Sequence, residues 1–259
     1  MTLKPNLGPD TWAQEPDGSI FVFLDEAYAP YVAYAGVVLE ASDAQRLERK
    51  IEEDFERMRG WHHLKGLPSF EKFRARGFHA SENPPEIQAA FIAFLSETLN
   101  FKSMIVYSDR SERPDLSDKK RLMIVLDHLV RDILRKYRRR PKVVLYFESA
   151  QAMDPFIHRV AIRAARAESN GKQRVEIRFG TKRDPDLLAV PDYVLRVFGK
   201  WKYSFDDLPL ILDRLDHRAR AVATIAGSIS MAKLIDRPYH ETNPVIEVIR
   251  RHTLTPPDC

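Results

Sequence analysis

Two short, continuously apolar runs in the chain each end in a carboxylate. Residues 20–24 read Ile-Phe-Val-Phe-Leu and precede Asp25 and Glu26, while residues 142–147 read Lys-Val-Val-Leu-Tyr-Phe and precede Glu148. Runs of this length, rich in β-branched and aromatic residues, are typical of strands buried on both faces. A carboxylate at the end of such a strand either needs a cationic partner or a metal, or belongs to a solvated turn. The first run alone leaves both interpretations open. The repetition of the pattern in the second run favours a carboxylate that needs a cationic partner or a metal.

The periodicity of apolar residues along the remaining chain predicts an alternation of strands and helices. Strands are expected at 19–26, 31–39, 103–107, 142–148 and 174–179. Helical spacing with start and stop signals predicts helices at about 42–59, 85–99, 118–139, 154–168 and 191–198. The segment 61–82 reads as irregular and basic, and the chain from 206 to about 251 reads as helical.

This order of elements is typical of an α/β fold with one mixed, five-stranded sheet and helices on its faces. We expect an irregular N-terminal arm over 1–18 and an α/β domain over 19–203. A helical insertion after the second strand covers about 42–99, and a helical C-terminal extension covers 204–259.

Composition narrows the class of protein without naming a function. The chain has 259 residues, is 44% hydrophobic and 30% charged, and carries a formal net charge of +4. Its one cysteine, Cys259, excludes an internal disulfide and a cysteine-clustered zinc site. Apolar runs are too short for a membrane span, and the first residues show no signal-peptide pattern. We therefore expect a cytoplasmic protein with no membrane partner.

Basic residues gather between positions 131 and 142, where Asp132 is the one acid. Such a cluster is typical of an anion-binding patch. It is equally typical of a solvated helix end, where cations interact favourably with the helix dipole. The sequence leaves both readings open. The residues that would contact a nucleic acid are Arg131, Arg135, Lys136, Arg138, Arg139 and Arg140.

Three acids recur at comparable places in the predicted fold. Asp25 and Glu148 each end a strand, and Asp192 follows Pro191 at the start of a helix. Carboxylates at the same end of adjacent strands can share a divalent cation, and Mg²⁺ and Mn²⁺ prefer such oxygen ligands. Each acid alone is more often structural than catalytic, but the three together predict a metal site.

Four short motifs between residues 20 and 200 carry a family resemblance. They are Phe23-Leu24-Asp25-Glu26, Phe78-His79-Ala80-Ser81, Phe147-Glu148-Ser149 and Leu188-Ala189-Val190-Pro191-Asp192-Tyr193-Val194. In order and spacing the chain resembles the ribonuclease H-like superfamily, and more narrowly the bacterial family called domain of unknown function 3800. The resemblance implies a ribonuclease H-like sheet and a metal-dependent phosphodiesterase, with Asp25, Glu148 and Asp192 as metal ligands.

Second candidates for the same site are Glu26, His79 and Glu82. A histidine beside a metal site can move protons or contact the scissile phosphate. His79 is also readable as a histidine at the surface or at the edge of the core, which is the commoner situation.

The leading hypothesis is therefore a nuclease that hydrolyses the nucleic-acid backbone with Mg²⁺ or Mn²⁺ and leaves a free 3′-hydroxyl. Backbone phosphates would bind the cations of 131–140 and basic residues of 61–76. The main alternative is a catalytically degenerate module of the same fold that binds nucleic acid or protein. A phosphohydrolase acting on small phosphates is a third reading, although no P-loop glycine pattern supports it.

Overall fold

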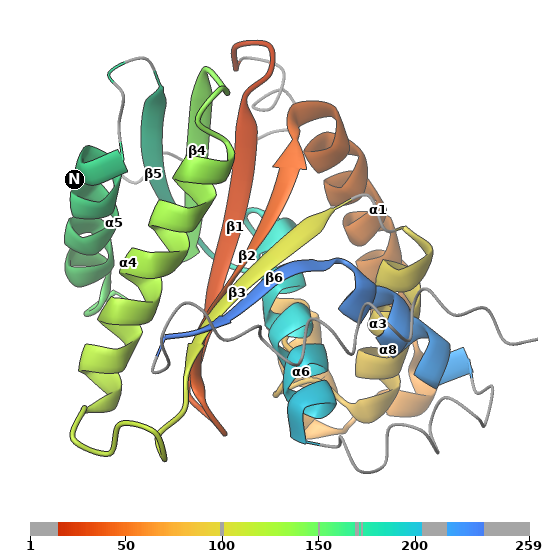
Figure 1. Cartoon of the computed structure of the whole chain (residues 1–259). Coiled ribbons are helices and arrows are strands. Elements are labelled where there is room, and N and C mark those ends of the chain that lie inside the picture. The colour runs from red at the N-terminus through yellow and green to blue at the C-terminus, as the bar shows by residue number, and fades with distance from the viewer. Residues whose placement is uncertain are drawn as a thin grey trace, which may run out of the picture.

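The computed structural model describes residues 15–98, 101–149, 151–168, 171, 173–203 and 217–235. Its centre is one six-stranded sheet with the order β5-β4-β1-β2-β3-β6 (Figure 1). The strands are β1 (Ile20–Ala27), β2 (Val32–Glu40), β3 (Lys102–Ser108), β4 (Lys142–Glu148), β5 (Arg174–Gly180) and β6 (Ile229–Leu234). The fold class is therefore α/β with a mixed sheet, as the sequence predicts.

Strand directions in the centre of the sheet bring the predicted acids to one end. β2 is antiparallel to both β1 and β3, whereas β4 runs parallel to β1 and β5 runs parallel to β4. The register pairs Leu24 of β1 with Phe147 of β4. Asp25 and Glu148 are the next residues on these two neighbouring strands, so their backbones leave the paired region side by side.

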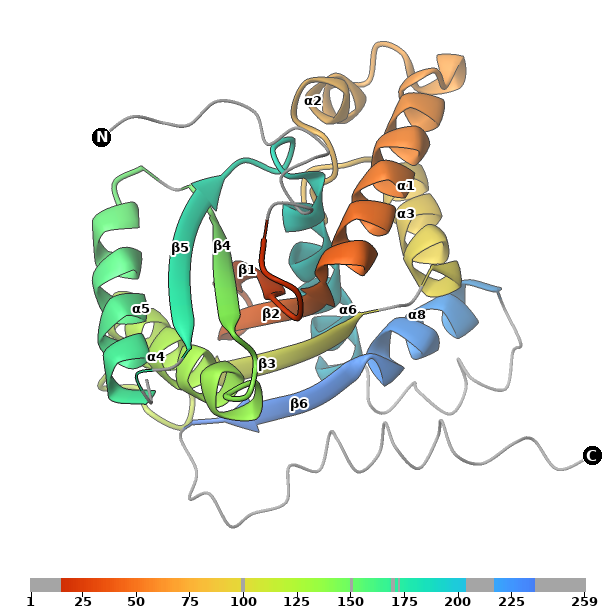
Figure 2. The same cartoon turned by 90° about the horizontal axis from the view of Figure 1, so that it is seen from above.

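Helices cover both faces of the sheet, and Figures 1 and 2 show the resulting three layers. One face packs against α4 (Asp118–Lys136) and α5 (Asp154–Glu168). The opposite face is covered by α1 (Ala41–Arg59), α2 (Pro68–Arg76), α3 (Pro85–Glu97), α6 (Ala189–Tyr203) and α8 (His217–Gly227). Short 3-10 turns, η1 (His62–Leu64) and η2 (Asp186–Leu188), join some of them.

Burial on β1 explains why its sequence is continuously apolar. Phe21 and Phe23 face the core beneath α6 and α1, while Val22 and Leu24 face the core beneath α4. Side chains of a strand alternate between the two faces, so a strand with helices on both sides is apolar at every position. The prediction of a strand buried on both faces is confirmed.

Two predictions about secondary structure are wrong. The sheet has a sixth strand, β6, where a helical C-terminal extension was expected, and α2 lies within the segment 61–82, which was expected to be irregular. Ile229 and Ala232 are buried where β6, the edge strand, pairs with β3, so sheet pairing outweighs the weak helical pattern. Within the extension, α8 is helical as predicted, while 204–216 and 236–259 lie outside the described residues, as does most of the 1–18 arm.

No helix in the described part of the chain combines the length and the apolar character needed to cross a bilayer.

Candidate metal centre

Three acids from distant parts of the sequence meet at one atom, the Nζ of Lys182. This nitrogen lies 3.0 Å from Oδ2 of Asp25, 3.1 Å from Oε2 of Glu148 and 2.7 Å from Oδ2 of Asp192. No two of these oxygens can be further apart than the sum of their distances to the shared nitrogen. The structure therefore brings together the three acids that the sequence singled out, around a lysine that it did not.

Each acid is positioned by a regular element. Asp25 and Glu148 come from the adjacent parallel strands β1 and β4, and Asp192 comes from the first turn of α6, beneath the same end of the sheet. Oδ1 of Asp25 accepts a hydrogen bond of 2.9 Å from the Glu26 backbone N–H, which turns Oδ2 toward the lysine. Lys182 lies just past the end of β5, in a turn closed by two backbone hydrogen bonds between Thr181 and Asp184.

The loop between α2 and α3 completes one side of the site. The backbone N–H of Ala80 donates to Oδ2 of Asp192 at 3.0 Å. Asn83, which is buried, accepts hydrogen bonds from the His79 backbone N–H at 2.6 Å and from the Tyr193 hydroxyl at 3.2 Å. Because Tyr193 follows Asp192 on α6, these contacts fix the loop and the helix relative to each other.

Charge at the site is unbalanced toward the acids. Burial raises the pKa of Asp25 well above its usual value, Lys182 opposes this rise, and the nearby carboxylates of Asp192, Glu26 and Glu148 add to it. Burial alone would lower the pKa of Lys182, but the three surrounding carboxylates raise it above its usual value. Three carboxylates thus contact one ammonium group and Glu26 lies close by, so the acidic groups outnumber the cations at the site.

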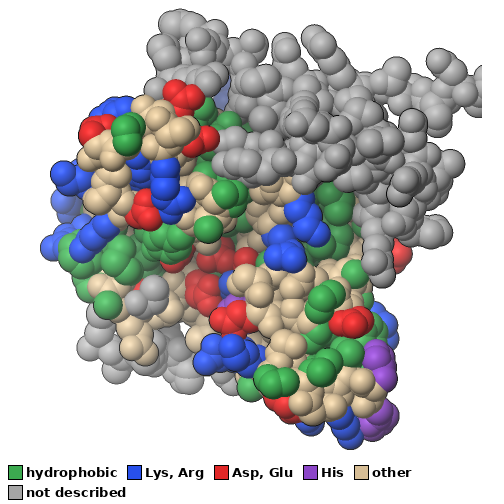
Figure 3. All heavy atoms as spheres, turned by 90° about the horizontal axis from the view of Figure 1, so that it is seen from below, with side chains coloured by type: hydrophobic (Ala, Val, Ile, Leu, Met, Phe, Trp, Pro, Cys, Tyr) green, Lys and Arg blue, Asp and Glu red, His purple; other side chains and the backbone are tan. Residues whose placement is uncertain are grey.

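Solvent reaches the cluster through Glu148 and Asp192. The side chains of Lys182 and Asp25 are 5% and 6% exposed, whereas those of Asp192 and Glu148 are 18% and 27% exposed. In the view from below, Figure 3 shows acidic side chains gathered in a hollow of the surface, with Lys and Arg side chains on two sides of it. Glu148 and Asp192 are therefore partly open to solvent, whereas Asp25 and Lys182 are buried behind them.

His79 lies in contact with the same lysine. Its Nδ1 is 3.3 Å from Nζ of Lys182. Burial, followed by the positive charge of Lys182, lowers the pKa of His79, so the ring is neutral at pH 7. An Nδ1 that accepts from an ammonium leaves the ring proton on Nε2, which is then the nitrogen free to donate. The structure places this second candidate at the site.

The other second candidates differ in their positions. Glu26 is a close neighbour of the cluster, since burial and then the carboxylate of Glu148 raise its pKa. Glu82 turns toward α2 instead, where its Oε2 lies 3.5 Å from Arg76 and 4.0 Å from Lys72. The expectation that Glu82 joins the acids is not supported, because two cations of α2 attract it.

The chemistry of the donor set fits a hard divalent cation, since all three groups offer carboxylate oxygens. Taken as they stand, the described residues include no group of three or more His, Cys, Asp or Glu side chains that could hold a metal ion. At this site the Lys182 ammonium stands where the carboxylate oxygens meet. A cation at that point requires the lysine to move.

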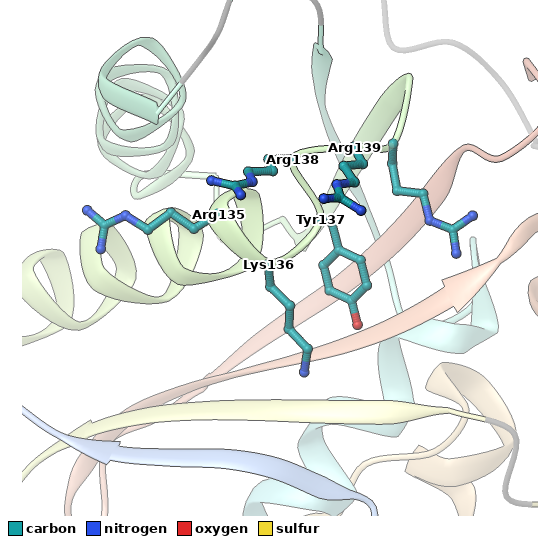
Figure 4. A pocket seen from close by; sticks show the side chains of 6 residues that line it. Arg135, Lys136, Tyr137, Arg138 and Arg139 are labelled. Carbon is teal, nitrogen blue, oxygen red and sulfur yellow. The ribbon is translucent and has the colours of Figure 1, made fainter.

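The predicted nucleic-acid patch lies elsewhere. Arg135, Lys136, Tyr137, Arg138, Arg139 and Arg140 line a pocket at the C-terminal end of α4. This end leads into the first residue of β4, so it lies at the opposite end of that strand from Glu148. Figure 4 shows the side chains of Arg135 and Lys136 pointing in different directions. The patch is thus not next to the acids.

Several cations of this patch are also paired with acids. Arg131 lies 2.7 Å from Asp127, Arg135 lies 2.7 Å from Glu168, and Arg140 pairs with Glu40. The structure therefore does not support the expectation that Arg131, Arg135, Lys136, Arg138, Arg139 and Arg140 form a phosphate-binding surface, because acids compensate part of its charge.

Comparisons of the chain with protein-family models, curated proteins and solved structures found no match. The resemblance to the ribonuclease H-like superfamily accordingly stays a prediction.

Lys182 is the functional candidate that sequence reasoning missed. Its one signal is position, because it lies two residues after the end of the fifth strand and ten residues before Asp192. The short segment between β5 and α6 must stay near the first turn of α6, which carries Asp192. A lone lysine in a basic chain gives no pattern that would separate it from a surface residue.

Proposed function

We propose that this protein is a divalent-cation-dependent nuclease of the ribonuclease H-like class that hydrolyses phosphodiester bonds. One observation carries the proposal: oxygens of Asp25, Glu148 and Asp192 all lie within 3.1 Å of a single point, the Nζ of Lys182, and two of the three side chains are partly exposed to solvent. The strand order supports the same class, because it places the ends of β1 and β4 side by side above the start of α6.

Asp25, Glu148 and Asp192 are the residues that would hold Mg²⁺ or Mn²⁺, with Glu26 adding negative charge beside them. When bound there, the cation supplies charge stabilisation at a phosphate and activation of water. Backbone hydrogen bonds position two of these ligands. The Glu26 N–H donates to Oδ1 of Asp25, and the Ala80 N–H donates to Oδ2 of Asp192. These contacts limit the reorganisation that binding requires.

His79 is suited to handling a proton at this site. Its ring is neutral at pH 7, and the proton on Nε2 is available to an oxygen of the substrate or of the leaving group. The backbone of His79 is held by its N–H, which donates to Oδ1 of Asn83, and its Nδ1 lies 3.3 Å from Nζ of Lys182.

A polyanionic substrate needs positive charge around a negative site. Lys and Arg side chains flank the acidic hollow in Figure 3, and Lys72 and Arg76 of α2 lie beside Glu82, which belongs to the His79 loop. These cations, rather than those at the end of α4, are the nearer candidates for backbone phosphates. Binding through them is expected to weaken as salt increases.

A specific observation favours a second candidate function, a non-catalytic binding module of the same fold. Lys182 already supplies a cation to all three acids, and a permanently seated ammonium would make a metal unnecessary. Such a module would bind nucleic acid or a protein without cutting it. Manganese binding measured by calorimetry separates the two, since the module would bind none.

A cleavage assay tests the leading proposal. Single-stranded RNA, single-stranded DNA and an RNA–DNA hybrid are incubated with Mg²⁺ or Mn²⁺ and wild type, Asp25→Asn or Glu148→Gln. We expect each substitution to lower the rate about 100-fold or more. Glu176→Gln is the matched control, because Glu176 lies on β5 and pairs with Lys142 and Arg178 away from the site. Equal activity in wild type and both site variants would contradict the proposal.

A further inference from the structure

The Lys182 side chain combines a fixed base with a movable end. Two reciprocal hydrogen bonds, from the Asp184 N–H to the Thr181 carbonyl at 2.8 Å and from the Thr181 N–H to the Asp184 carbonyl at 3.1 Å, close the turn that carries it. The ammonium stands on a flexible four-carbon stem with three donors. Its end can therefore change position while the turn stays closed.

In its observed position the ammonium compensates the negative charge of the three acids, as a bound metal cation would. Three carboxylates form ion pairs with it at 2.7 to 3.1 Å, and Nδ1 of His79 is a fourth neighbour at 3.3 Å. Three buried or half-buried carboxylates repel one another strongly without a cation between them. Lys182 thus holds the acids in one arrangement before any metal arrives.

Two cations cannot share this point. A divalent ion with ligands at about 2 Å would lie well within the same oxygen cage, close to the ammonium nitrogen. Two adjacent positive centres in a partly desolvated site repel each other strongly. Metal binding consequently requires the ammonium to leave the centre of the cage.

We propose that Lys182 is a resident cation that assembles the three carboxylates in the metal-free protein and competes with the divalent cation for them, so that it sets the affinity of the site. This inference rests on the proposed function, because it takes the acids to be a metal site. Lys182 is in this view a positioning residue that lowers metal affinity and preserves the geometry of the empty cage.

Titration calorimetry with MnCl₂ on the full chain tests the inference. We expect Lys182→Met to bind Mn²⁺ at least about tenfold more tightly than wild type, since the competitor is gone. Thermal unfolding gives a second readout: metal-free Lys182→Met should melt below wild type and gain more from Mn²⁺. Lys142→Met is the matched control, because Lys142 also lies between two acids, 2.6 Å from both Glu15 and Glu176, far from the site.

The outcomes are distinguishable. Equal or weaker Mn²⁺ binding by a folded Lys182→Met, with binding by wild type retained, overturns the role of the lysine and leaves the metal site standing. Absence of Mn²⁺ binding in wild type and every variant overturns both the metal site and the inference. If the methionine variant does not fold, Lys182→Gln, which keeps a hydrogen-bond donor without the charge, is expected to show the same gain in affinity and is judged by the same criteria.

Discussion

Nζ of Lys182 lies 2.7 Å from Oδ2 of Asp192, and this ion pair joins the turn after β5 to the first turn of α6. The same oxygen accepts the Ala80 backbone N–H, so the loop between α2 and α3 meets the pair as well. The loop around Ala80, which is more than 100 residues away in the sequence, is thereby joined to the turn and the helix beside the ends of β1 and β4. The arrangement has consequences for activity and for stability.

Replacing the His79 side chain should affect catalysis more than assembly. His79→Ala is expected to lower the cleavage rate by about 10- to 100-fold, because a proton carrier is lost. Mn²⁺ affinity should change little, since the histidine anchors its loop through its backbone N–H. His128→Ala is the control: this histidine of α4 also has a pKa lowered by burial, but it lies near Lys233, away from the acids. An unchanged rate in His79→Ala would mean that the ring has only a structural role.

A methyl group at Gly180 should disturb the turn that carries Lys182. A Cβ atom there would lie 2.2 Å from the Asp184 carbonyl oxygen, so the backbone must shift. The Gly180 carbonyl also accepts the Ser149 N–H at 2.8 Å, next to Glu148. We expect Gly180→Ala to lose about 2 kcal/mol or more of unfolding free energy. Thermal denaturation measures this loss.

Gly60→Ala is the control for that substitution, because its nearest neighbouring atom would be 3.4 Å away and its φ is −78°. A melting temperature unchanged in Gly180→Ala would show that the turn is less tightly constrained than its geometry indicates.

Glu48 gives the protein a pH-dependent stability. Burial, and then the nearby Asp186, raise the pKa of this α1 carboxyl to about 8. Its Oε1 accepts the Asp186 backbone N–H at 3.0 Å, while no partner for Oε2 is found among the described residues. The folded state therefore holds a proton that the unfolded state has released above pH 4.5, and the free energy of unfolding falls as pH rises toward 8.

Glu48→Gln removes this titration, and its side-chain amide oxygen can still accept the Asp186 backbone N–H. We expect the variant to be more stable than wild type at pH 8 by about 1–2 kcal/mol and to show a flatter dependence between pH 5 and pH 8. Urea denaturation at the two pH values measures the difference. Identical slopes in both proteins would contradict the assignment.

Among the residues that the structure describes, Arg121 is the largest fully buried side chain, and its guanidinium donates to neutral acceptors. It donates to the Ser108 hydroxyl at 2.7 Å, to the Asp109 carbonyl at 3.1 Å and to the Leu116 carbonyl at 3.2 Å. Arg121→Met leaves these groups without that donor and should cost about 2–4 kcal/mol in chemical denaturation.

The control for this substitution is Arg113→Met. Arg113 is half exposed and pairs with Asp115 at 2.9 Å, and such surface pairs contribute at most about 1 kcal/mol. A loss for Arg121→Met no larger than that of the control would show that the buried guanidinium contributes little.

Much of the fold could be predicted from the sequence, because apolar runs and helix-start signals indicate most of its strands and helices. The apolar runs before Asp25 and Glu148 form the two strands they predict, and Asp154 with Pro155 begins α5 where the capping signal lies. β6 was missed because Ile229–Leu234 becomes a strand only by pairing with β3, a partner far away in the sequence. α2 was missed because its nine residues carry only two buried positions, Phe70 and Phe73.

The candidate site was predictable to a similar degree. Asp25, Glu148 and Asp192 stood at ends of predicted elements, where convergence follows from the topology. The contact of Lys182 with the three acids depends on where the turn after β5 places one flexible side chain. The periodicity of apolar residues in the sequence carries no information about that position. The basic cluster near Arg135 misled because sequence shows the cations of α4 but not the acids, such as Glu168, that pair with them.

A crystal structure of the protein soaked in MnCl₂ tests the central claim most directly. We expect an anomalous peak at about 2 Å from carboxylate oxygens of Asp25, Glu148 and Asp192, with the Lys182 ammonium displaced from their centre. Absence of an anomalous peak at saturating Mn²⁺, with Lys182 still seated among the three acids, would contradict the account.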